Sequence, residues 1–314
     1  MVIGAGNIGR RHLQALTNLK RDHSLYALDP SMDALDLAFK MYNEVKTSDS
    51  PKLYRADDIK KLPSNIFTVI VATSSRHRYH VTKSLFEKEI QHIIFEKVLF
   101  QNPDEYHEIE YHLINNNIQS WVNCWRRAVP FYRELIKSNQ SEGLISLNVK
   151  GDNWGIASNA IHFIDLLSYI NNFTDYQFNE NIIEIVQSKR SGYHEFVGEM
   201  KGAFGSGLIP FSFQSIKTSD NISCVITLEF ENKTIIIDDD QGWWIEKSFN
   251  KSEIRHKVKI PYQSEMTHLH INDLAEGGNC SLTPFYESCK LHLPMIEYFT
   301  SIFKQNGIQG CPVT

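Results

Sequence analysis

The chain has 314 residues with a formal net charge of −5, and 42% of its residues are hydrophobic while 22% are charged. This is the composition of an ordinary globular protein, and its acidic balance gives no general attraction to nucleic acid or to an anionic membrane. No run approaches the roughly 18 apolar residues of a membrane-spanning helix, and we expect no signal peptide. Neither nucleic acid nor a membrane is therefore an expected partner. At roughly 150 residues per domain, the length predicts two domains.

The five cysteines are scattered along the chain and form no Cys-x-x-Cys pair. An odd number without regular spacing is typical of free thiols in a reducing compartment, and it favours neither a disulfide framework nor a zinc site. We therefore expect a cytoplasmic protein with no metal centre.

The first motif is a Gly-x-Gly-x-x-Gly turn, which follows a very short apolar strand at 1–3 and precedes a helical pattern at 10–19. Strand, turn and helix in this order begin the βαβ unit that binds dinucleotides. Its glycines allow a tight turn, a close approach of the backbone to a pyrophosphate and close packing of helix on strand, while the helix N-terminus attracts the phosphates. The residues expected to bind the cofactor here are Gly4, Gly6, Asn7, Ile8 and Gly9.

A second strand is predicted at 25–29, and it ends on Asp29, twenty residues beyond the last glycine. An acid in this place hydrogen-bonds a ribose 2′-OH and repels a 2′-phosphate. The sequence therefore predicts that NAD is preferred and that NADP is the poorer cofactor. Arg10 and Arg11 favour the opposite preference, because their charge offsets part of the repulsion.

The pattern alternates between helix and strand up to about residue 121. The remaining elements of this half are a helix at 32–42, a strand at 67–72, a helix at 80–89, a strand at 93–95, a helix at 102–115 and a strand at 120–123. The continuous apolar run at 67–72 is typical of a strand buried on both faces. We therefore predict a doubly wound parallel Rossmann sheet in a dinucleotide-binding domain at 1–121.

The second half is dominated by strands with period-two alternation. They are predicted at 143–150, 182–189, 196–204, 208–213, 223–231, 234–239, 242–247 and 253–260, with helices at 130–137, 159–170 and 284–303. This pattern predicts a substrate-binding α+β domain at 122–314 with a large, mostly antiparallel sheet. The last helix is expected to pack back on the first domain.

Polar residues follow two of the predicted parallel strands at their carboxyl ends, where open α/β sheets bind ligands. Thr73 and Ser74 come after the strand at 67–72, and small hydroxyl residues there approach a ribose or nicotinamide closely. Glu96 and Lys97 come after the next strand, and a lysine there opposes charge that develops on a substrate oxygen. The alternatives are an ordinary loop cap and a solvated ion pair of no consequence.

A loop at 153–159 leads into a helix that carries His162 and Asp165. Residues three apart share a helix face, so Asp165 is a candidate to orient the imidazole as a general acid/base. The alternative is a structural histidine, which is the commoner case.

These pieces resemble, in this order, the Gfo/Idh/MocA family of NAD(P)-dependent oxidoreductases. The resemblance rests on Gly4-x-Gly6-x-x-Gly9-x-x-His12, Ala72-Thr73 with His80, Glu96-Lys97, residues 122–127, the helix with Gly155, His162 and Asp165, and the ending at 311–314. It implies activity on sugars, inositols or sugar nucleotides, catalysis by Lys97 and His162, and a place for His80 and Glu96 at the cofactor. Two positions depart from the family pattern: Val98 replaces a proline, and Ser158 replaces an aspartate four residues before the histidine.

We therefore expect hydride transfer between nicotinamide and a secondary alcohol or ketone of a sugar, cyclitol or sugar nucleotide. The predicted substrate residues are Lys97, Arg126, Arg127, Trp154, Ser158, Asn159 and His162. The arginine pair is suited to a carboxylate or diphosphate, unless one member points inward and the other is solvated. The rival interpretations are a family member that retains its cofactor for lyase or internal redox chemistry, and a dinucleotide-binding protein without turnover.

We also expect a homodimer or homotetramer. The antiparallel sheet is rich in large apolar residues that one helix layer does not obviously cover, and the family associates through this sheet. The residues concerned are Phe196, Phe204, Phe211, Phe213, Val225, Trp243 and Trp244.

Overall fold

The computed structural model describes residues 1–20, 22–139, 142–218, 222–248 and 253–314. The chain folds into two compact units. Unit 1 consists of Met1–Asn123 and Pro261–Tyr286, and unit 2 consists of Cys124–Ile260 and Glu287–Thr314. Each unit contains one sheet with helices packed against it, so the predicted combination of a Rossmann sheet and an α+β sheet is confirmed.

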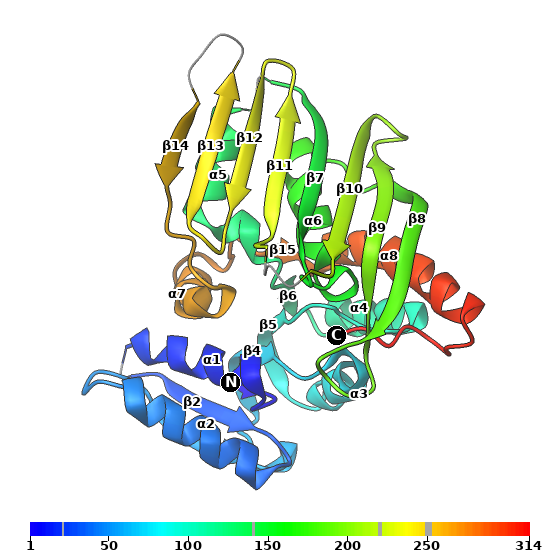
Figure 1. Cartoon of the computed structure of the whole chain (residues 1–314). Helices are drawn as coiled ribbons and strands as arrows, with labels where there is room; N and C mark the ends of the chain where they lie inside the picture. Colours follow the sequence, from blue (N-terminus) through cyan, green and yellow to red (C-terminus); the bar gives the residue numbers. More distant parts are fainter. Residues whose placement is uncertain (21, 140–141, 219–221, 249–252) are drawn as a thin grey trace. The chain divides into compact units, whose positions relative to one another are not determined.

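Unit 1 is built on a seven-stranded sheet in the order β15-β6-β5-β4-β1-β2-β3 (Figure 1). Its strands are β1 (Val2–Ile3), β2 (Ser24–Leu28), β3 (Lys52–Ala56), β4 (Asn65–Val71), β5 (Glu89–Phe95), β6 (Gln119–Val122) and β15 (Thr283–Pro284). Its helices are α1 (Asn7–Ala15), α2 (Met32–Val45), α3 (Ser75–Leu85), α4 (Pro103–Asn115) and α7 (Thr267–Gly277). Strands β1 to β6 pair in parallel in the doubly wound order of dinucleotide-binding domains.

Local sequence explains most of these elements. The carboxyl-terminal halves of β4 and β5 are buried without alternation, as expected for strands covered on both faces. Ser31 caps α2 by accepting a hydrogen bond from the backbone N–H of Ala34, and Asn102 caps α4 just before Pro103. Helix α3 starts at Ser75, earlier than the predicted 80, because its N-cap directly follows the loop after β4.

The segment 261–286 differs from the prediction, which placed it in the second domain. It returns to unit 1, where β15 pairs antiparallel with β6 and Thr267 of α7 lies 2.7 Å from the Nδ1 atom of His12. Both contacts join residues far apart in the sequence, so no local pattern indicates them. Strand β3 was also not predicted; it pairs in parallel with β2 at the edge of the sheet.

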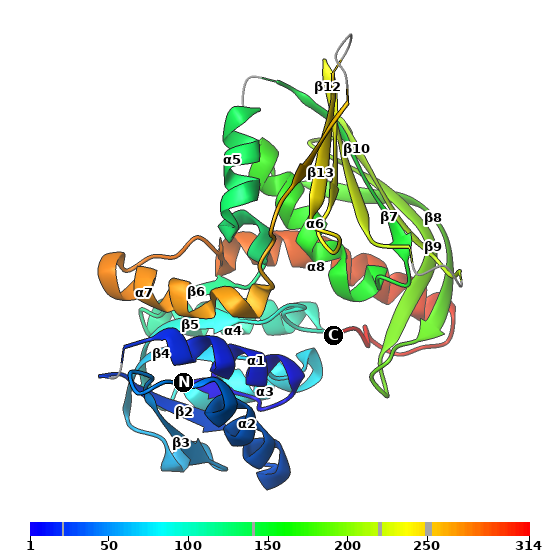
Figure 2. The ribbon, with the colours of Figure 1, turned by 60° about the vertical axis from the view of Figure 1, so that its left-hand side comes forward.

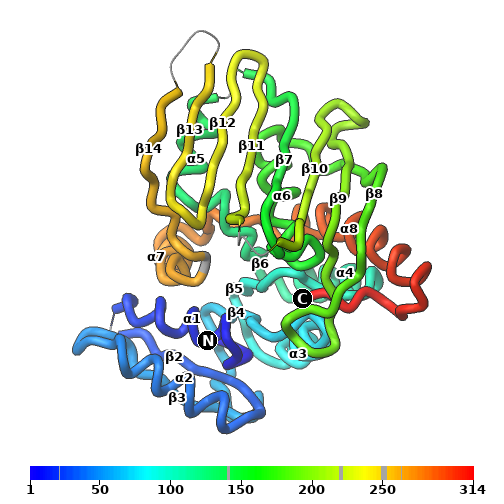
Figure 3. Tube along the Cα trace, in the orientation of Figure 1, coloured from blue at the N-terminus to red at the C-terminus, as the bar shows by residue number. Residues whose placement is uncertain are grey.

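Unit 2 is built on an eight-stranded sheet in the order β14-β13-β12-β11-β7-β10-β9-β8. Its strands are β7 (Leu144–Asp152), β8 (Tyr176–Gln187), β9 (His194–Phe204), β10 (Ile209–Ile216), β11 (Val225–Phe230), β12 (Lys233–Asp238), β13 (Trp243–Ser248) and β14 (Ile254–Lys257). Its helical elements are the 3-10 turn η3 (Trp125–Ala128), α5 (Pro130–Ser138), α6 (Ile156–Asn171) and α8 (Phe285–Gln305). Strand β7 lies between β11 and β10 and is parallel to β10, while the other pairs are antiparallel (Figure 3).

Helices α5, α6 and α8 cover one face of this sheet (Figure 2). From Glu287 onward α8 belongs to unit 2, where the ring of Phe303 stacks on Phe196. Phe285, one of the two α8 residues in unit 1, packs there against Phe95. The packing of the last helix on the first domain otherwise stays a prediction.

The four phenylalanines expected on an open face of the sheet lie in the core instead. Phe196, Phe204 and Phe213 are fully buried, and Phe213 packs against Phe163 of α6. The opposite face carries polar residues such as Ser212, whose hydroxyl donates to Glu199. These phenylalanines therefore give no support to an oligomer formed through the uncovered face. Val225, Trp243 and Trp244 are half-buried.

Within the described ranges, no helix combines the length and the apolar character that crossing a bilayer requires. All five cysteines are free thiols. Burial raises the pKa of the Cys224, Cys280 and Cys311 thiols to about 12.

Candidate active site

The glycine-rich turn connects β1 to α1, and each glycine answers a different requirement. Gly4 has a positive φ of 92°. A Cβ atom on Gly9 would lie 1.8 Å from the carbonyl oxygen of Gly4, so only glycine allows the helix to pack this closely. A Cβ on Gly6 would meet nothing within 4 Å. Space at Gly6 is what the approach of a pyrophosphate requires.

Asp29 directly follows β2 and reaches back to the glycine-rich turn. Its Oδ2 atom accepts a hydrogen bond from the backbone N–H of Ala5 at 2.7 Å, and its Oδ1 atom accepts from Ser31 at 2.9 Å. The carboxylate is half-buried and keeps lone pairs for further donors. No side chain caps the N-terminus of α1, where phosphates bind in such folds. These features fit a dinucleotide, with Asp29 toward the ribose and the α1 N-terminus toward the pyrophosphate.

Two alanine substitutions separate folding from binding at this turn. We expect Gly6→Ala to leave the melting temperature unchanged and to weaken dinucleotide binding at least tenfold, since its methyl group takes space only a ligand needs. We expect Gly9→Ala to lower the free energy of unfolding by about 1–3 kcal/mol, as overpacking does. Thermal melts and fluorescence titration with NADH measure the two effects. Equal destabilisation by both variants would contradict this division.

The loop after β4 contains Thr73 and Ser74, both half-buried, and Ser74 is the N-cap residue of α3. Arg78 of α3 is 2% exposed and donates from its guanidinium to the carbonyl oxygens of Thr73 and Val98. This side chain therefore ties the loop after β4 to the loop after β5. Sequence reasoning missed it, because an arginine on a polar helix is normally predicted to be solvated. His80, further along α3, is exposed.

Glu96 directly follows β5 and lies in a buried polar network. The residue is 3% exposed, and its Oε1 atom lies 3.0 Å from Nε2 of His12 and accepts from Asn123 at 2.7 Å. Burial alone disfavours the carboxylate, but the hydrogen bond and charge of His12 outweigh it and lower the pKa of Glu96. The contacts therefore favour a role in fixing the loop over the direct cofactor contact that we expected.

Lys97 follows this anchored residue and is half-buried. The Lys97–Val98 peptide bond is cis, and Val98 is wholly buried. The lysine therefore leaves the carboxyl end of β5 from a backbone fixed on both sides, by Glu96 and by the contact of Arg78 with the Val98 carbonyl. Within unit 1, the glycine-rich turn, Asp29 and the loops after β4 and β5 all follow the carboxyl ends of parallel strands, which is the edge where such sheets bind ligands.

The remaining candidate residues lie in unit 2, around α6. His162 is 5% exposed, and its ring centroid lies 6.5 Å from that of Trp125 in an edge-on arrangement. The entry turn is held by Asn159, whose amide donates to the Trp154 carbonyl at 2.6 Å. The indole N–H of Trp154 in turn donates to the Gln214 carbonyl at 2.8 Å.

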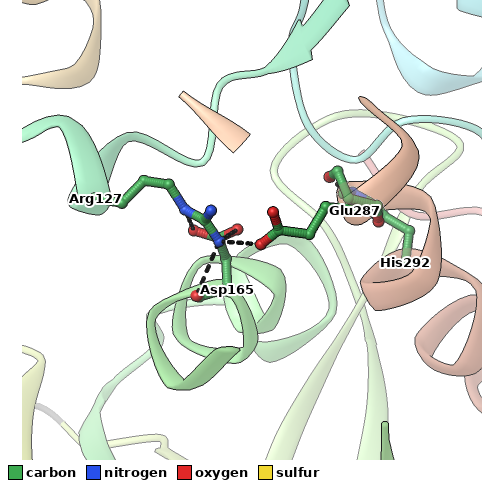
Figure 4. Close-up of polar contacts among 5 residues, drawn as sticks. Arg127, Asp165, Glu287 and His292 are labelled. Carbon is green, nitrogen blue, oxygen red and sulfur yellow. Dashed lines mark hydrogen bonds and ion pairs between the residues drawn. The ribbon is translucent and has the colours of Figure 1, made fainter. Parts of the chain in front are cut away.

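Asp165 is fully buried and bound to Arg127. The guanidinium donates from Nε to Oδ2 at 3.0 Å and from Nη2 to Oδ1 at 2.7 Å, and Nη2 also donates to Glu287 at 2.9 Å (Figure 4). Burial disfavours this cation, but the two carboxylates outweigh that effect and raise the pKa of Arg127. His292 of α8 is near this cluster but bonds to Ser288.

Arg126 is likewise buried, and its Nη2 atom donates to Asp239 at 2.9 Å. The alternative of one inward and one solvated arginine is therefore wrong, because both are inward. Neither guanidinium is presented as an open anion site, since carboxylates of the same unit hold both. The two arginines are therefore not among the proposed substrate contacts.

The Rossmann sheet of unit 1, together with the glycine-rich turn and Asp29, defines a dinucleotide-binding protein. Residues 1–123 match the model of the Gfo/Idh/MocA family, described as an oxidoreductase family with an NAD-binding Rossmann fold. The match covers the first domain and agrees there with the resemblance that the motifs predicted. No match was found among curated protein sequences.

Solved structures show the same fold over nearly the whole chain at low identity. A dehydrogenase (MviM) from Clostridium difficile is 16% identical, with 97% of this chain and 98% of that chain covered and a TM-score of 0.74. A UDP-N-acetylglucosamine 3-dehydrogenase from Acidithiobacillus ferrooxidans is 9% identical, with 94% of each chain covered and a TM-score of 0.73. The transcriptional regulator Gal80p from Kluyveromyces lactis is 14% identical, with 99% and 93% covered and a TM-score of 0.69.

Proposed function

We propose that this protein is an NAD-dependent oxidoreductase that transfers a hydride between nicotinamide and a secondary alcohol or ketone of a sugar, cyclitol or sugar nucleotide. The observation that carries the proposal is the turn at Gly6, which is open where a pyrophosphate approaches and is bonded to Asp29 through Ala5. The family match over residues 1–123 supports the cofactor class. The sugar-type substrate is supported by the sugar-nucleotide dehydrogenase among proteins of the same fold.

The cofactor, when bound, supplies an acceptor or donor for the hydride at its nicotinamide ring. During oxidation, the alcohol carbon loses that hydride, and His162 takes the hydroxyl proton as general base, leaving a carbonyl. In the reverse direction the protonated imidazole returns the proton. Lys97 hydrogen-bonds the reacting oxygen, and its cation stabilises the developing alkoxide. Trp154, Ser158 and Asn159, at the start of α6, are the proposed substrate contacts.

NAD(H) is expected to bind more tightly than NADP(H), because a 2′-phosphate would meet the Asp29 carboxylate. The two nearby arginines compensate little, since Arg10 donates to Asn7 and Arg11 to Gln14 on their own helix. We expect a preference of at least tenfold, about 1.4 kcal/mol. Titration of both cofactors at fixed ionic strength measures it, and tighter NADP(H) binding would overturn the assignment.

A screen of sugars, cyclitols and sugar nucleotides with NAD(H) and NADP(H), followed at 340 nm, tests the proposed reaction. Net cofactor turnover supports the dehydrogenase. Product without net turnover supports instead a retained cofactor in lyase or internal redox chemistry. Binding without any product supports a dinucleotide-binding protein without turnover. The presence of a transcriptional regulator among proteins of this fold favours keeping this last alternative.

We further propose that the protein works in the cytoplasm, which the five free thiols support. A homodimer or homotetramer is also proposed, on the family resemblance alone. Light scattering at micromolar concentration gives the mass, and a strict monomer would exclude this assembly.

A further inference from the structure

One buried guanidinium holds the two loops that follow β4 and β5. Arg78 of α3 is 2% exposed, and its Nη1 atom donates to the carbonyl oxygens of Val98 and Leu99, the latter at 3.0 Å. Its Nη2 atom donates to the carbonyl oxygen of Thr73, in the loop after β4. Because the N–H donors of a guanidinium carry charge and lie in one rigid plane, the acceptors bound to them are held strongly and in fixed relative positions. Arg78 therefore joins the loop after β4 to the loop after β5.

The residues that follow Val98 are held by side chains of two helices. The amide of Gln101 donates to the hydroxyl of Ser75, at the start of α3, at 3.1 Å. The hydroxyl of Tyr106, on α4, donates to the Phe100 carbonyl at 2.9 Å and accepts from the Phe100 N–H at 3.2 Å. Every residue from Val98 to Gln101 therefore makes a hydrogen bond to α3 or α4.

Lys97 lies between two anchored neighbours. On its amino side, Oε1 of Glu96 accepts from Asn123 at 2.7 Å and lies 3.0 Å from Nε2 of His12. On its carboxyl side, the next carbonyl is one that Arg78 holds. The amine of a lysine ends a flexible four-carbon stem, so its position depends on where the backbone starts that stem. Arg78 therefore links the backbone beside Lys97 directly to the loop after β4.

The two joined loops have different parts in the proposed reaction. The loop after β4 carries Thr73 and Ser74, which the sequence predicts to lie at the cofactor. The loop after β5 carries Lys97, which is proposed to bind the reacting oxygen. Hydride transfer requires the two reacting atoms in near contact, and a displacement of about 1 Å can lower a rate about a hundredfold. A residue that fixes the separation of these loops is therefore suited to set the rate without touching either ligand.

We propose that Arg78 is a positioning residue for the proposed reaction: by holding the Thr73 and Val98 carbonyl oxygens on one guanidinium, it fixes Lys97 relative to the loop after β4. The inference rests on the proposed function for its catalytic meaning, but its first measurement needs no substrate. Arg78 acts through the backbone beside Lys97, so its effect on the reaction requires the Lys97 amine. The alternative is a purely structural arginine that satisfies buried carbonyl groups and affects stability alone.

The first test measures how accessible the Lys97 amine is to an acylating reagent. The full-length protein is labelled with a trace of N-acetoxysuccinimide, and peptide mass spectrometry compares the acylation rate of Lys97 with that of Lys40, an exposed lysine of α2. We expect Arg78→Gln to raise this ratio about threefold or more, because release of the Val98 carbonyl lets the segment with the half-buried Lys97 open locally. An unchanged or lower ratio would overturn the proposal.

Arg78→Lys tests whether the planar group itself matters. Lysine keeps the cation but presents a point charge instead of a planar fork, so the ratio should rise as it does in Arg78→Gln. This variant also serves if Arg78→Gln does not fold. A wild-type ratio in folded Arg78→Lys, or failure of both variants to fold, would overturn the proposal, since Arg78 would then act by charge alone or be required for the fold itself.

Thr82→Val is the matched control for a loosened helix. Thr82 is fully buried on α3, and its hydroxyl donates to the backbone carbonyl of Arg78 at 2.7 Å. Valine removes this bond and leaves the guanidinium and its acceptors unchanged. The melting temperature should therefore fall, whereas the Lys97 ratio should stay at the wild-type value. An equal rise of the ratio in Thr82→Val would count against the proposal, because general loosening of α3 would then explain the result.

A double-mutant cycle with the substrate found in the screen gives a readout that a structural role does not move. At saturating NAD(H), Arg78→Gln should lower kcat/KM about tenfold or more in the wild-type background but less than about twofold in Lys97→Met, because the effects of residues that act through one another do not add. Equal losses in both backgrounds would overturn the proposal. Absence of turnover in the screen overturns the proposed function alone, whereas an unmoved labelling ratio overturns the role of Arg78 alone.

Discussion

Lys97→Met should lower kcat/KM by about a hundredfold or more, a loss of about 3 kcal/mol of transition-state stabilisation. Methionine keeps much of the apolar stem and removes the charge that opposes the developing alkoxide. The backbone at this point is fixed independently of Lys97, because Glu96 bonds to His12 and Asn123 and Arg78 bonds to the Val98 carbonyl. The melting temperature should therefore stay close to that of the wild-type protein.

Lys83→Met is the matched control for this experiment. Lys83 belongs to an exposed ion pair with Glu108 on neighbouring helices, with 2.6 Å between Nζ and Oε1. Such pairs contribute about 0–1 kcal/mol to stability and nothing to a reaction elsewhere. Unchanged kcat/KM is expected for this variant. A loss under threefold in Lys97→Met on the true substrate would make Lys97 an ordinary surface residue.

His162→Ala should remove most of the turnover, because loss of one positioned acid/base typically costs roughly 10² to 10⁴ in rate. Dinucleotide affinity should stay within a few-fold of wild type, since His162 lies in unit 2 and the glycine-rich turn in unit 1. Stopped-flow kinetics and an NADH titration measure the two quantities.

The control for His162 is His107→Ala, which changes an exposed histidine on α4. It should retain full activity. Full activity in His162→Ala itself would remove this residue from the mechanism, and a large loss of NADH affinity would indicate that the substitution disturbs more than proton transfer.

The sequence predicted those parts of the fold that local patterns determine. The continuous apolar run before Thr73 was a buried strand, and the helix that follows Asp29 begins at the expected residue. Patterns of this kind are local, because burial on one or both faces dictates which residues a strand or helix accepts. The segment 261–286 was misplaced because its partners, β6 and His12, lie far away in the chain.

The residues of the candidate site also differ in whether a local pattern in the sequence predicts their contacts. The spacing of the glycines and Asp29 predicted their arrangement, since the turn and the end of β2 belong to one βαβ unit. The spacing of His162 and Asp165 predicts a pair, which stays a prediction, and it gives no indication that Arg127, 38 residues earlier in the chain, bonds to the same carboxylate. Arg78 bonds to the Val98 carbonyl, 20 residues later in the chain, and leaves no local signal in the sequence. These contacts join residues far apart in the chain, so neither the hydrophobic periodicity nor the spacing of residues in the sequence indicates them.

Transfer of deuterium from the substrate carbon to the cofactor tests the central claim most directly. A substrate identified in the screen is prepared with deuterium at the carbon that is oxidised, incubated with the wild-type protein and NAD, and the released NADH is analysed by mass spectrometry. We predict one deuterium per NADH, bound at the nicotinamide ring, in equal amount to the ketone formed. Product that keeps the label, with no labelled NADH released, would contradict net hydride transfer by this protein.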